Sequence, residues 1–412
     1  MNKNYRVIII TAVVFLLQVG LLKGQVTNSV YSMFGVGQLI DNNFGINKSL
    51  GGTGIAFQSG RSINYLNPSS YMGLLPKSYV VEAGVYGMYG NSSTANQSES
   101  NTEINLNYFS ISLYLTDWWA TSVGIVPYSS VGYEINSSDE IDGELTLFTK
   151  RYEGSGGLNK IYWGNSFRVF GGLSAGLNIS YLGGHVNQTE IAESSGDFTG
   201  YELTNKMNIS GLYLDYGLQY SFEMDDLEYT LGLTYSPGQI LSTTNELDFE
   251  YNSSTTTLED YQTPDIKIPK TIGVGLAVKS GAEFRAGIDY EWRSWNDIVY
   301  SNAMINTKNS SRFSAGVEYT PGGGKNTSWY EDLCYRIGAK YKNSYLEIDD
   351  IRINSMAFNL GIGIPYDTIN MINLSLEYGR EGTTKNGLIS NSYWMFYVSI
   401  SFHDFWKQVI NR

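Results

Sequence analysis

Apolar and polar residues alternate with unusual regularity in residues 281–297, GAEFRAGIDYEWRSWND. One set of alternate positions holds the apolar residues Phe284, Ala286, Ile288, Tyr290 and Trp292, and the other set holds the charged residues Glu283, Arg285, Asp289, Glu291 and Arg293. Successive side chains of a β-strand point to opposite faces, so the pattern predicts a strand with lipid on one face and a wet interior on the other. Taken alone, the segment also fits a half-buried strand of a soluble sandwich.

The alternation recurs in segments from residue 77 to residue 402. It is clearest in residues 226–235, 270–279, 312–320 and 333–341, where the positions between the apolar residues are mostly small or polar. With the weaker segments, the number of strands comes to about 14, and single-chain outer-membrane barrels require an even number. In the second strand the alternation changes phase between Tyr108 and Phe109. This change predicts a β-bulge.

The connections between these segments alternate in length. Short turns near residues 171–172 and 224–225 come between long polar loops at residues 134–156, 187–206 and 241–267. Short periplasmic turns and long external loops are typical of outer-membrane barrels, whereas a soluble sandwich has no reason to sort its loops in this way. The two patterns together predict an all-β fold, a transmembrane antiparallel β-barrel formed by residues 77–402.

The two ends of the chain differ from the barrel segments. Residues 1–24 have the pattern of a secretory signal peptide, with a basic start, an apolar run and Gly24 before the cleavage point. A retained membrane anchor is the alternative, although the run is short for a span. Residues 25–76 are rich in Gly, Ser and Asn and lack a sustained period, but they hold enough aromatic and aliphatic residues to pack, which predicts an N-terminal plug. Residues 403–412 are expected to form a periplasmic tail.

Composition narrows the range of functions. The net charge of −13 argues against a nucleic-acid partner, because phosphate binding needs a basic face. Only His185 and His403 are available for histidine chemistry, and Cys334 is the single cysteine. This is little material for a His-based catalytic triad, a metal site or a disulfide. We therefore expect no cofactor, no bound metal and no enzymatic activity.

Four motifs carry a family resemblance. They are residues 50–56 (LGGTGIA), 67–71 (NPSSY), 231–237 (LGLTYSP) and 289–295 (DYEWRSW). In order and spacing they resemble the FadL/TodX family of outer-membrane transporters for long-chain fatty acids and aromatic hydrocarbons, including the FadL-like barrels of Bacteroidetes. The resemblance implies a plug inside a 14-stranded barrel, an apolar pocket between external loops, and a sideways exit at a kinked third strand.

The resemblance also implies roles for particular residues. The plug, or hatch, would use Gly51, Gly52, Gly54, Asn67 and Pro68. Proline removes a hydrogen bond from a strand ladder, so Pro127 could kink the third strand and open the wall. The alternative is that this strand simply reaches the outer interface at Pro127.

The predicted interior carries charges of both signs. These include Glu283, Arg285, Asp289, Glu291, Arg293, Arg312 and Arg336. They most simply hold the plug and brace the wall, and an ion-selective pore is the alternative. The tryptophans at positions 118, 119, 163, 292, 295 and 394 are expected to form the interfacial girdle.

These observations favour passive uptake of a hydrophobic small molecule, fatty-acid-like or aromatic, across the cell outer membrane. Lipid of that membrane and the transported ligand would be the partners. The alternative is a barrel that does not transport and serves as an accessory subunit of an outer-membrane secretion or assembly complex, in contact with other outer-membrane proteins or lipoproteins.

Overall fold

The computed structural model describes nine stretches of the chain. They are residues 29–41, 43–140, 147–194, 200–252, 254–259, 265–295, 305–323, 328–367 and 369–406. The expected signal peptide lies outside them, as do residues 407–412 of the expected tail. Within the described stretches, no helix is long and apolar enough to cross a membrane.

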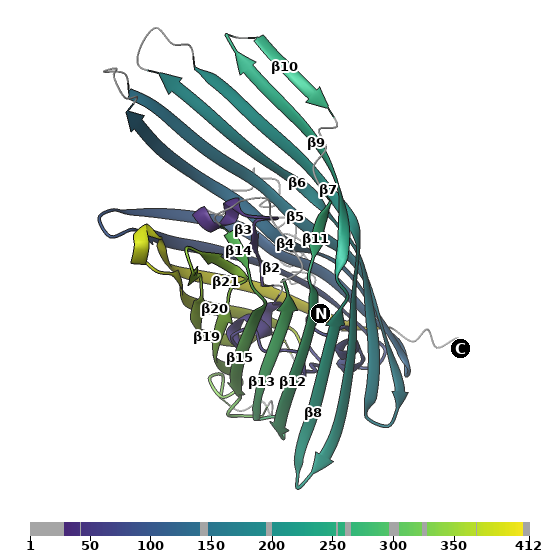
Figure 1. Cartoon of the computed structure of the whole chain (residues 1–412). Helices are drawn as coiled ribbons and strands as arrows, with labels where there is room; N and C mark the ends of the chain where they lie inside the picture. Colours follow the sequence, from purple (N-terminus) through teal and green to yellow (C-terminus); the bar gives the residue numbers. More distant parts are fainter. Residues whose placement is uncertain are drawn as a thin grey trace.

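Fourteen antiparallel strands form a closed barrel (Figure 1), which confirms the expected fold class. In chain order the wall consists of β2 (Ser78–Ser93), β3 (Ser98–Thr116), β4 (Trp119–Glu140), β5 (Leu147–Phe170), β6 (Leu173–Ser194), β7 (Tyr201–Met224), β8 (Leu227–Ser236) with β9 (Gln239–Tyr251), β11 (Ile266–Ile268) with β12 (Lys270–Ser280), β13 (Phe284–Ser294), β15 (Ser310–Tyr319), β16 (Cys334–Asn343), β19 (Ser355–Pro365), β20 (Met371–Gly382) and β21 (Ser390–Phe405). Each of the two composite strands is interrupted at a proline, Pro237 or Pro269, because proline cannot donate to the ladder. β2 pairs with β21, which closes the ring.

The alternation of faces along β13 agrees with the prediction. Phe284, Ile288 and Tyr290 are exposed on the outer surface, whereas Asp289 is only 3% exposed on the inner one. The prediction that Trp295 belongs to the interfacial girdle is wrong. Its side chain is fully buried and stacks on Tyr345, with ring centroids 4.0 Å apart. Trp295 falls in the same set of alternate positions as Asp289 and Arg293, so the alternation itself places it on the inner side, and it does not belong to the girdle.

The predicted bulge is present between β2 and β3. Gly84 lies opposite Tyr108 and Val85 lies opposite Leu106, so Asn107 is the extra residue. At the other end of the chain, β21 runs past Phe402 to Phe405, so the strand takes up the first residues of the expected tail.

Several strands are much longer than a bilayer requires. β5 and β7 have 24 residues each, whereas a transmembrane strand needs about 9–11. On the side of the long connections, β4, β5, β6, β7 and β9 therefore rise beyond the rest of the wall, together with β10 (Ser254–Glu259) (Figure 1). We call this part the external sheet; its described residues are 131–140, 147–157, 186–194, 201–208, 242–251 and 254–259. β14 (Ile305–Thr307), β17 (Leu346–Ile348) and β18 (Ile351–Arg352) form a separate small sheet.

Residues 29–76, the N-terminal segment, pack against the inner face of the wall. Their elements are η1 (Val30–Met33), β1 (Gln38–Leu39), α2 (Gly45–Ser49) and η2 (Pro68–Gly73). α2 contacts β19, β20 and β21, whereas η2 contacts β5, β6 and β7. The segment thus touches both sides of the ring. The remaining helical element, η3 (Lys385–Gly387), lies between β20 and β21.

Candidate functional site

Asn67 and Pro68 anchor the N-terminal segment to the wall. The Asn67 side-chain amide donates to the carbonyl oxygen of Ile55 at 2.8 Å and to that of Leu218, on β7, at 3.1 Å. Its own oxygen accepts from the backbone N–H of Ser69 at 3.1 Å, and Pro68 occupies the first position of η2. Proline suits this position because its missing N–H would have no helical partner there. Asn67 therefore caps η2 and fastens it to the barrel.

The expected hatch glycines lie where the segment turns against the wall. Gly51 and Gly52 have φ values of +67° and +83°, which side chains other than glycine rarely adopt. A Cβ on Gly51 would lie 2.6 Å from the backbone nitrogen of Ala339, so the two chains approach too closely for any side chain. Gly54 instead contributes its N–H to a wall carboxylate, that of Asp289.

Two buried wall carboxylates accept hydrogen bonds from the segment. Oδ2 of Asp289 accepts from Gly54 at 2.6 Å and from Ile55 at 2.9 Å. On the opposite part of the wall, Oε2 of Glu82 accepts from the N–H of Ile63 at 2.9 Å, and its other oxygen accepts from the hydroxyl of Tyr108 at 2.6 Å. Asp289 therefore connects β13 to the segment. The role of Glu82 was not predicted. It is the only charged residue of β2, so this strand shows no row of charges that would mark an inner face.

Four further charged residues of the wall form a group of ion pairs with Asp41 of the segment. Asp41 lies 2.9 Å from Lys340 and 3.5 Å from Arg312. Arg312 also contacts Glu291 at 3.3 Å, and Glu291 contacts Arg293 at 2.7 Å. These contacts connect Asp41 of the segment to charged residues of the wall.

A second ion-pair group lies nearer the short turns. Glu318 contacts Arg285 at 2.9 Å and Arg336 at 2.5 Å. Arg285 also donates to the carbonyl oxygen of Gln58 at 3.1 Å, which ties this group to the segment. Glu283 differs from the expectation. It lies exposed in the turn before β13 and is not part of the inner wall, because the strand begins only at Phe284.

Two charged groups of the segment, Asp41 and Lys48, have shifted pKa values. Burial disfavours the Asp41 carboxylate, but Lys340 and Arg312 outweigh burial and hold the pKa of Asp41 well below its usual range. Burial, reinforced by the charge of Lys340, lowers the pKa of Lys48 to about 8. Asp41 therefore stays ionised inside the barrel, whereas Lys48 is close to losing its proton.

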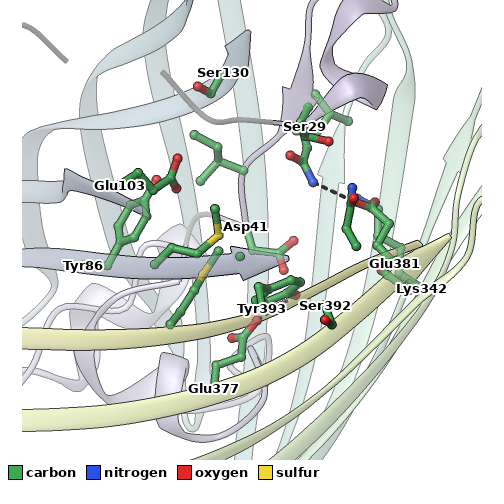
Figure 2. A pocket seen from close by; sticks show the side chains of 18 of the residues that line it. Ser29, Asp41, Tyr86, Glu103, Ser130, Lys342, Glu377, Glu381, Ser392 and Tyr393 are labelled. Carbon is green, nitrogen blue, oxygen red and sulfur yellow. Dashed lines mark hydrogen bonds between the residues drawn. The ribbon is translucent and has the colours of Figure 1, made fainter. Parts of the chain in front are cut away.

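A cavity of about 130 Å³ lies beside Asp41, between the segment and β2, β20 and β21 (Figure 2). Tyrosine and methionine side chains form much of its lining: Tyr86, Met88, Tyr393, Met395 and Tyr397. Charged side chains line the rest, among them Lys48, Lys342, Glu377 and Glu381. Gln38 donates to Glu381 at 2.9 Å, and Lys342 has no hydrogen bond or ion pair to any described residue. The cavity can therefore accept a molecule with an apolar body and a polar end.

The wall is not paired along its full height between β3 and β4. In the described part of both strands, their pairing starts at the short turn and ends at Phe109 and Ile125. Above this level, β1 pairs with the edge of β4 instead, with Gln38 opposite Ser130. We call the separated edges, residues 98–108 of β3 and 126–140 of β4, the seam. Pro127 lies at the lower end of the seam, where the register of β4 against β5 shifts.

Some of these residues had no signal in the sequence. Asp41, Lys48 and Gln38 belong to a segment without periodicity, so no pattern assigned them to a face. Among the described residues, no group of His, Cys, Asp and Glu side chains is arranged to hold a metal ion.

The fold resembles solved hydrocarbon channels. The Pseudomonas putida toluene transporter TodX has a TM-score of 0.63 at 15% identity, covering 89% of this chain and 99% of that one. The Ralstonia pickettii toluene transporter TbuX has a TM-score of 0.60 at 14% identity, covering 87% and 98%. A Pseudomonas aeruginosa FadL homologue has a TM-score of 0.59 at 10% identity, covering 89% and 99%. The expected likeness to the FadL/TodX barrels is thus confirmed for the fold.

Comparison at the level of sequence gives the family. No curated protein matches the chain. The family model described as BamG matches residues 1–411, nearly the whole length. The chain has the fold of the FadL-like outer-membrane barrels, and its sequence shows that it belongs to the BamG family.

Proposed function

We propose that this outer-membrane barrel takes up small hydrophobic molecules, which enter the cavity beside Asp41 and leave sideways through the seam. The seam is the observation that carries the proposal. Inside a bilayer an unpaired strand edge is costly, because lipid offers no hydrogen bonds. β1 and the residues around it supply partners to β4 over part of the seam, so the N-terminal segment acts as a plug that also closes the wall.

Hydrogen bonds along the seam are few enough to be exchanged. Ile40 donates to the carbonyl oxygen of Tyr128 at 3.0 Å, and Ser29 donates to that of Gly132 at 2.9 Å. With the two residue pairs of β1 and the two hydrogen bonds between the Ser32 hydroxyl and the backbone of Gly132, these contacts hold residues 29–40 against β4. Withdrawal of this stretch would join the cavity to the lipid beside Pro127, which would then act as the lateral opening.

The cavity lining supports the proposed class of ligand. Methionine side chains adapt to apolar bodies of irregular shape, and tyrosine rings offer flat apolar faces with a polar tip. Lys342 offers an unpaired cation beside them. Fatty acids fit this combination, and the apolar part of the lining also fits aromatic hydrocarbons such as toluene.

A disulfide across the seam tests the proposal. Gln38→Cys/Ser130→Cys joins directly opposite residues of β1 and β4, in a Cys334→Ala background that removes the buried native thiol. Uptake of oleate and of toluene is measured with purified protein in lipid vesicles. We expect uptake to fall about tenfold or more on oxidation and to recover with a reductant, since the route needs residues 29–40 to move.

The matched control is Thr189→Cys/Thr204→Cys, which joins directly opposite residues of β6 and β7, away from the cavity and the seam. This variant should transport equally with and without the reductant. Full uptake by the oxidised seam variant would exclude the seam as the route. No uptake by the unmodified protein would exclude the transport function itself.

A second candidate is an accessory subunit of an outer-membrane secretion or assembly complex. Membership in a family of its own, BamG, favours it, as does the dense set of contacts that holds the segment in place. Under this proposal the purified protein transports neither probe, and stable outer-membrane partners co-purify with it in mild detergent.

Export and processing complete the proposal. A cleaved signal peptide of residues 1–24 would leave Gln25 as the first residue, and residues 25–76 would form the plug domain. N-terminal sequencing of protein from isolated outer membranes tests the first point. A mature chain that still begins at Met1 would support a retained anchor instead.

A further inference from the structure

The polarity of the wall inverts in the external sheet. Within the membrane the outer face is apolar and the inner face is polar, but above it the outer face of β7 and β9 carries residues such as Lys206, Thr204 and Asp248. The inner face there carries Leu203 opposite Phe249. An apolar inner face outside the membrane needs a covering other than lipid.

Part of that covering is visible. The lower inner face of the external sheet packs against Tyr31, Val36 and Leu39 of the N-terminal segment. Farther out, Phe249, Tyr251 and Leu258 remain 41%, 45% and 55% exposed. Large apolar side chains gathered at the end of a sheet usually mark an interaction surface.

The edge of the same sheet is unprotected. β10 pairs with β9 along one side, and none of the described residues pairs with its other side. All six residues of β10 are exposed, and none is a proline or a lysine, the residues that usually guard free edges. An unguarded edge offers its backbone hydrogen bonds to an incoming strand.

The outer face beside this edge is acidic. Lys206 is held by Glu246 at 2.9 Å and by Asp248 at 2.6 Å. Glu250 and Glu259 have no ion pair with any described residue. An incoming strand would therefore meet uncompensated negative charge on its outer face.

We propose that an extended segment of a separate protein pairs with the free edge of β10. Its alternate apolar residues would lie on the inner face beside Leu258 and near Phe249, and its basic residues would lie on the outer face beside Glu259. This inference is independent of uptake, since it concerns a surface outside the seam and the cavity.

A synthetic peptide tests the surface directly. The probe is a fluorescent peptide of about nine residues, a typical strand length, that alternates valine and lysine. Two further peptides serve as comparison, one alternating valine and glutamate and one with the valines and lysines in separate blocks. Binding to the full-length protein in nanodiscs is measured by anisotropy, with empty nanodiscs as the blank. We expect the alternating basic peptide to bind about tenfold or more tightly than either comparison peptide.

Two matched variants separate edge pairing from general charge attraction. Leu258→Lys places a charge on the inner face of the edge, and Thr244→Lys adds the same charge to the outer face of β9, away from the edge. Both side chains are exposed, so neither variant should disturb folding. We expect Leu258→Lys to weaken binding about tenfold and Thr244→Lys to weaken it less than about threefold.

Three outcomes would overturn the proposal. The first is equal binding of the three peptides, and the second is an equal loss in the two variants. The third is self-association of the unmodified protein that Leu258→Lys abolishes, since the occupant of the edge would then be a second copy of this chain.

Discussion

Asp289→Ala removes the wall carboxylate that holds the N-terminal segment from the side of β13. One oxygen of this buried side chain accepts both the Gly54 and the Ile55 N–H. Hydrogen bonds to a charged group contribute about 1.5–3 kcal/mol each. Loss of both should therefore weaken the attachment of this part of the segment by about 3–6 kcal/mol.

The assay is hydrogen–deuterium exchange of the protein in nanodiscs, followed by mass spectrometry of peptides that contain Gly54 and Ile55. If these amides exchange through local detachment, a loss of about 3 kcal/mol raises their exchange rate by a factor of about 100 or more. Asp289→Asn keeps an acceptor oxygen and should raise the rate far less. Glu228→Ala breaks an exposed pair with Lys279 and is the control, since such pairs contribute about 0–1 kcal/mol.

Unchanged exchange in Asp289→Ala, measured beside a normal control, would refute the reasoning. It would mean that the segment is held elsewhere, or that these amides do not detach independently of the barrel. Equal acceleration in Asp289→Asn and Asp289→Ala would instead show that the negative charge itself, and not the acceptor geometry, holds the segment.

Three further predictions concern the segment and the wall. The pKa of Asp41 is lowered on folding, so its contribution to stability is present at neutral pH and is lost as pH falls from about 4 through the folded pKa. The difference in melting temperature between wild type and Asp41→Asn should therefore shrink on acidification. Gly51→Ala should detach its part of the segment and speed exchange there, because the new Cβ would collide with the backbone of Ala339. Trp295→Ala should cost about 3–5 kcal/mol in unfolding free energy, measured by denaturant titration, because it removes a buried ring stacked on Tyr345.

Each of these predictions has a contradicting result. A pH-independent difference for Asp41→Asn would mean that its ion pairs do not contribute to attachment. Wild-type exchange in Gly51→Ala would mean that the close approach to the wall does not persist in solution. A loss below about 1 kcal/mol for Trp295→Ala would place the ring at the surface, as expected for a tryptophan of the interfacial girdle.

The sequence predicted the strands of the barrel wall far better than the contacts of the N-terminal segment inside it. The two-residue period of β13 assigned Asp289 to the interior, because a strand leaves a side chain only two faces. The partners of Asp289 could not be predicted, since Gly54 and Ile55 belong to a segment without a period. Trp295 was assigned wrongly because tryptophan is typical of the interfacial girdle, although the alternation places position 295 on the inner side with Asp289.

Inward-facing glycines mark where the N-terminal segment lies against the wall. The sequence shows that these positions are small, but not that the segment contacts them. Gly316 and Gly338 are among the small residues at the predicted interior positions of residues 312–320 and 333–341. A Cβ at Gly338 would lie 2.1 Å from the backbone carbon of Leu50, so the glycine exists to admit the segment. The pattern within a strand could not predict the seam, because the seam depends on where two neighbouring strands stop pairing; only the family resemblance implied an opening at the third strand, which is β4.

Photolabelling tests the proposed route most directly. A diazirine analogue of toluene is photolysed with the protein in lipid vesicles, and the labelled residues are mapped by mass spectrometry. The proposal predicts adducts at Tyr86, Met88 or Tyr393 in the cavity and along the edges of the seam, all suppressed by excess toluene. Adducts confined to lipid-facing residues such as Phe358, unaffected by excess toluene, would contradict uptake through the cavity and the seam.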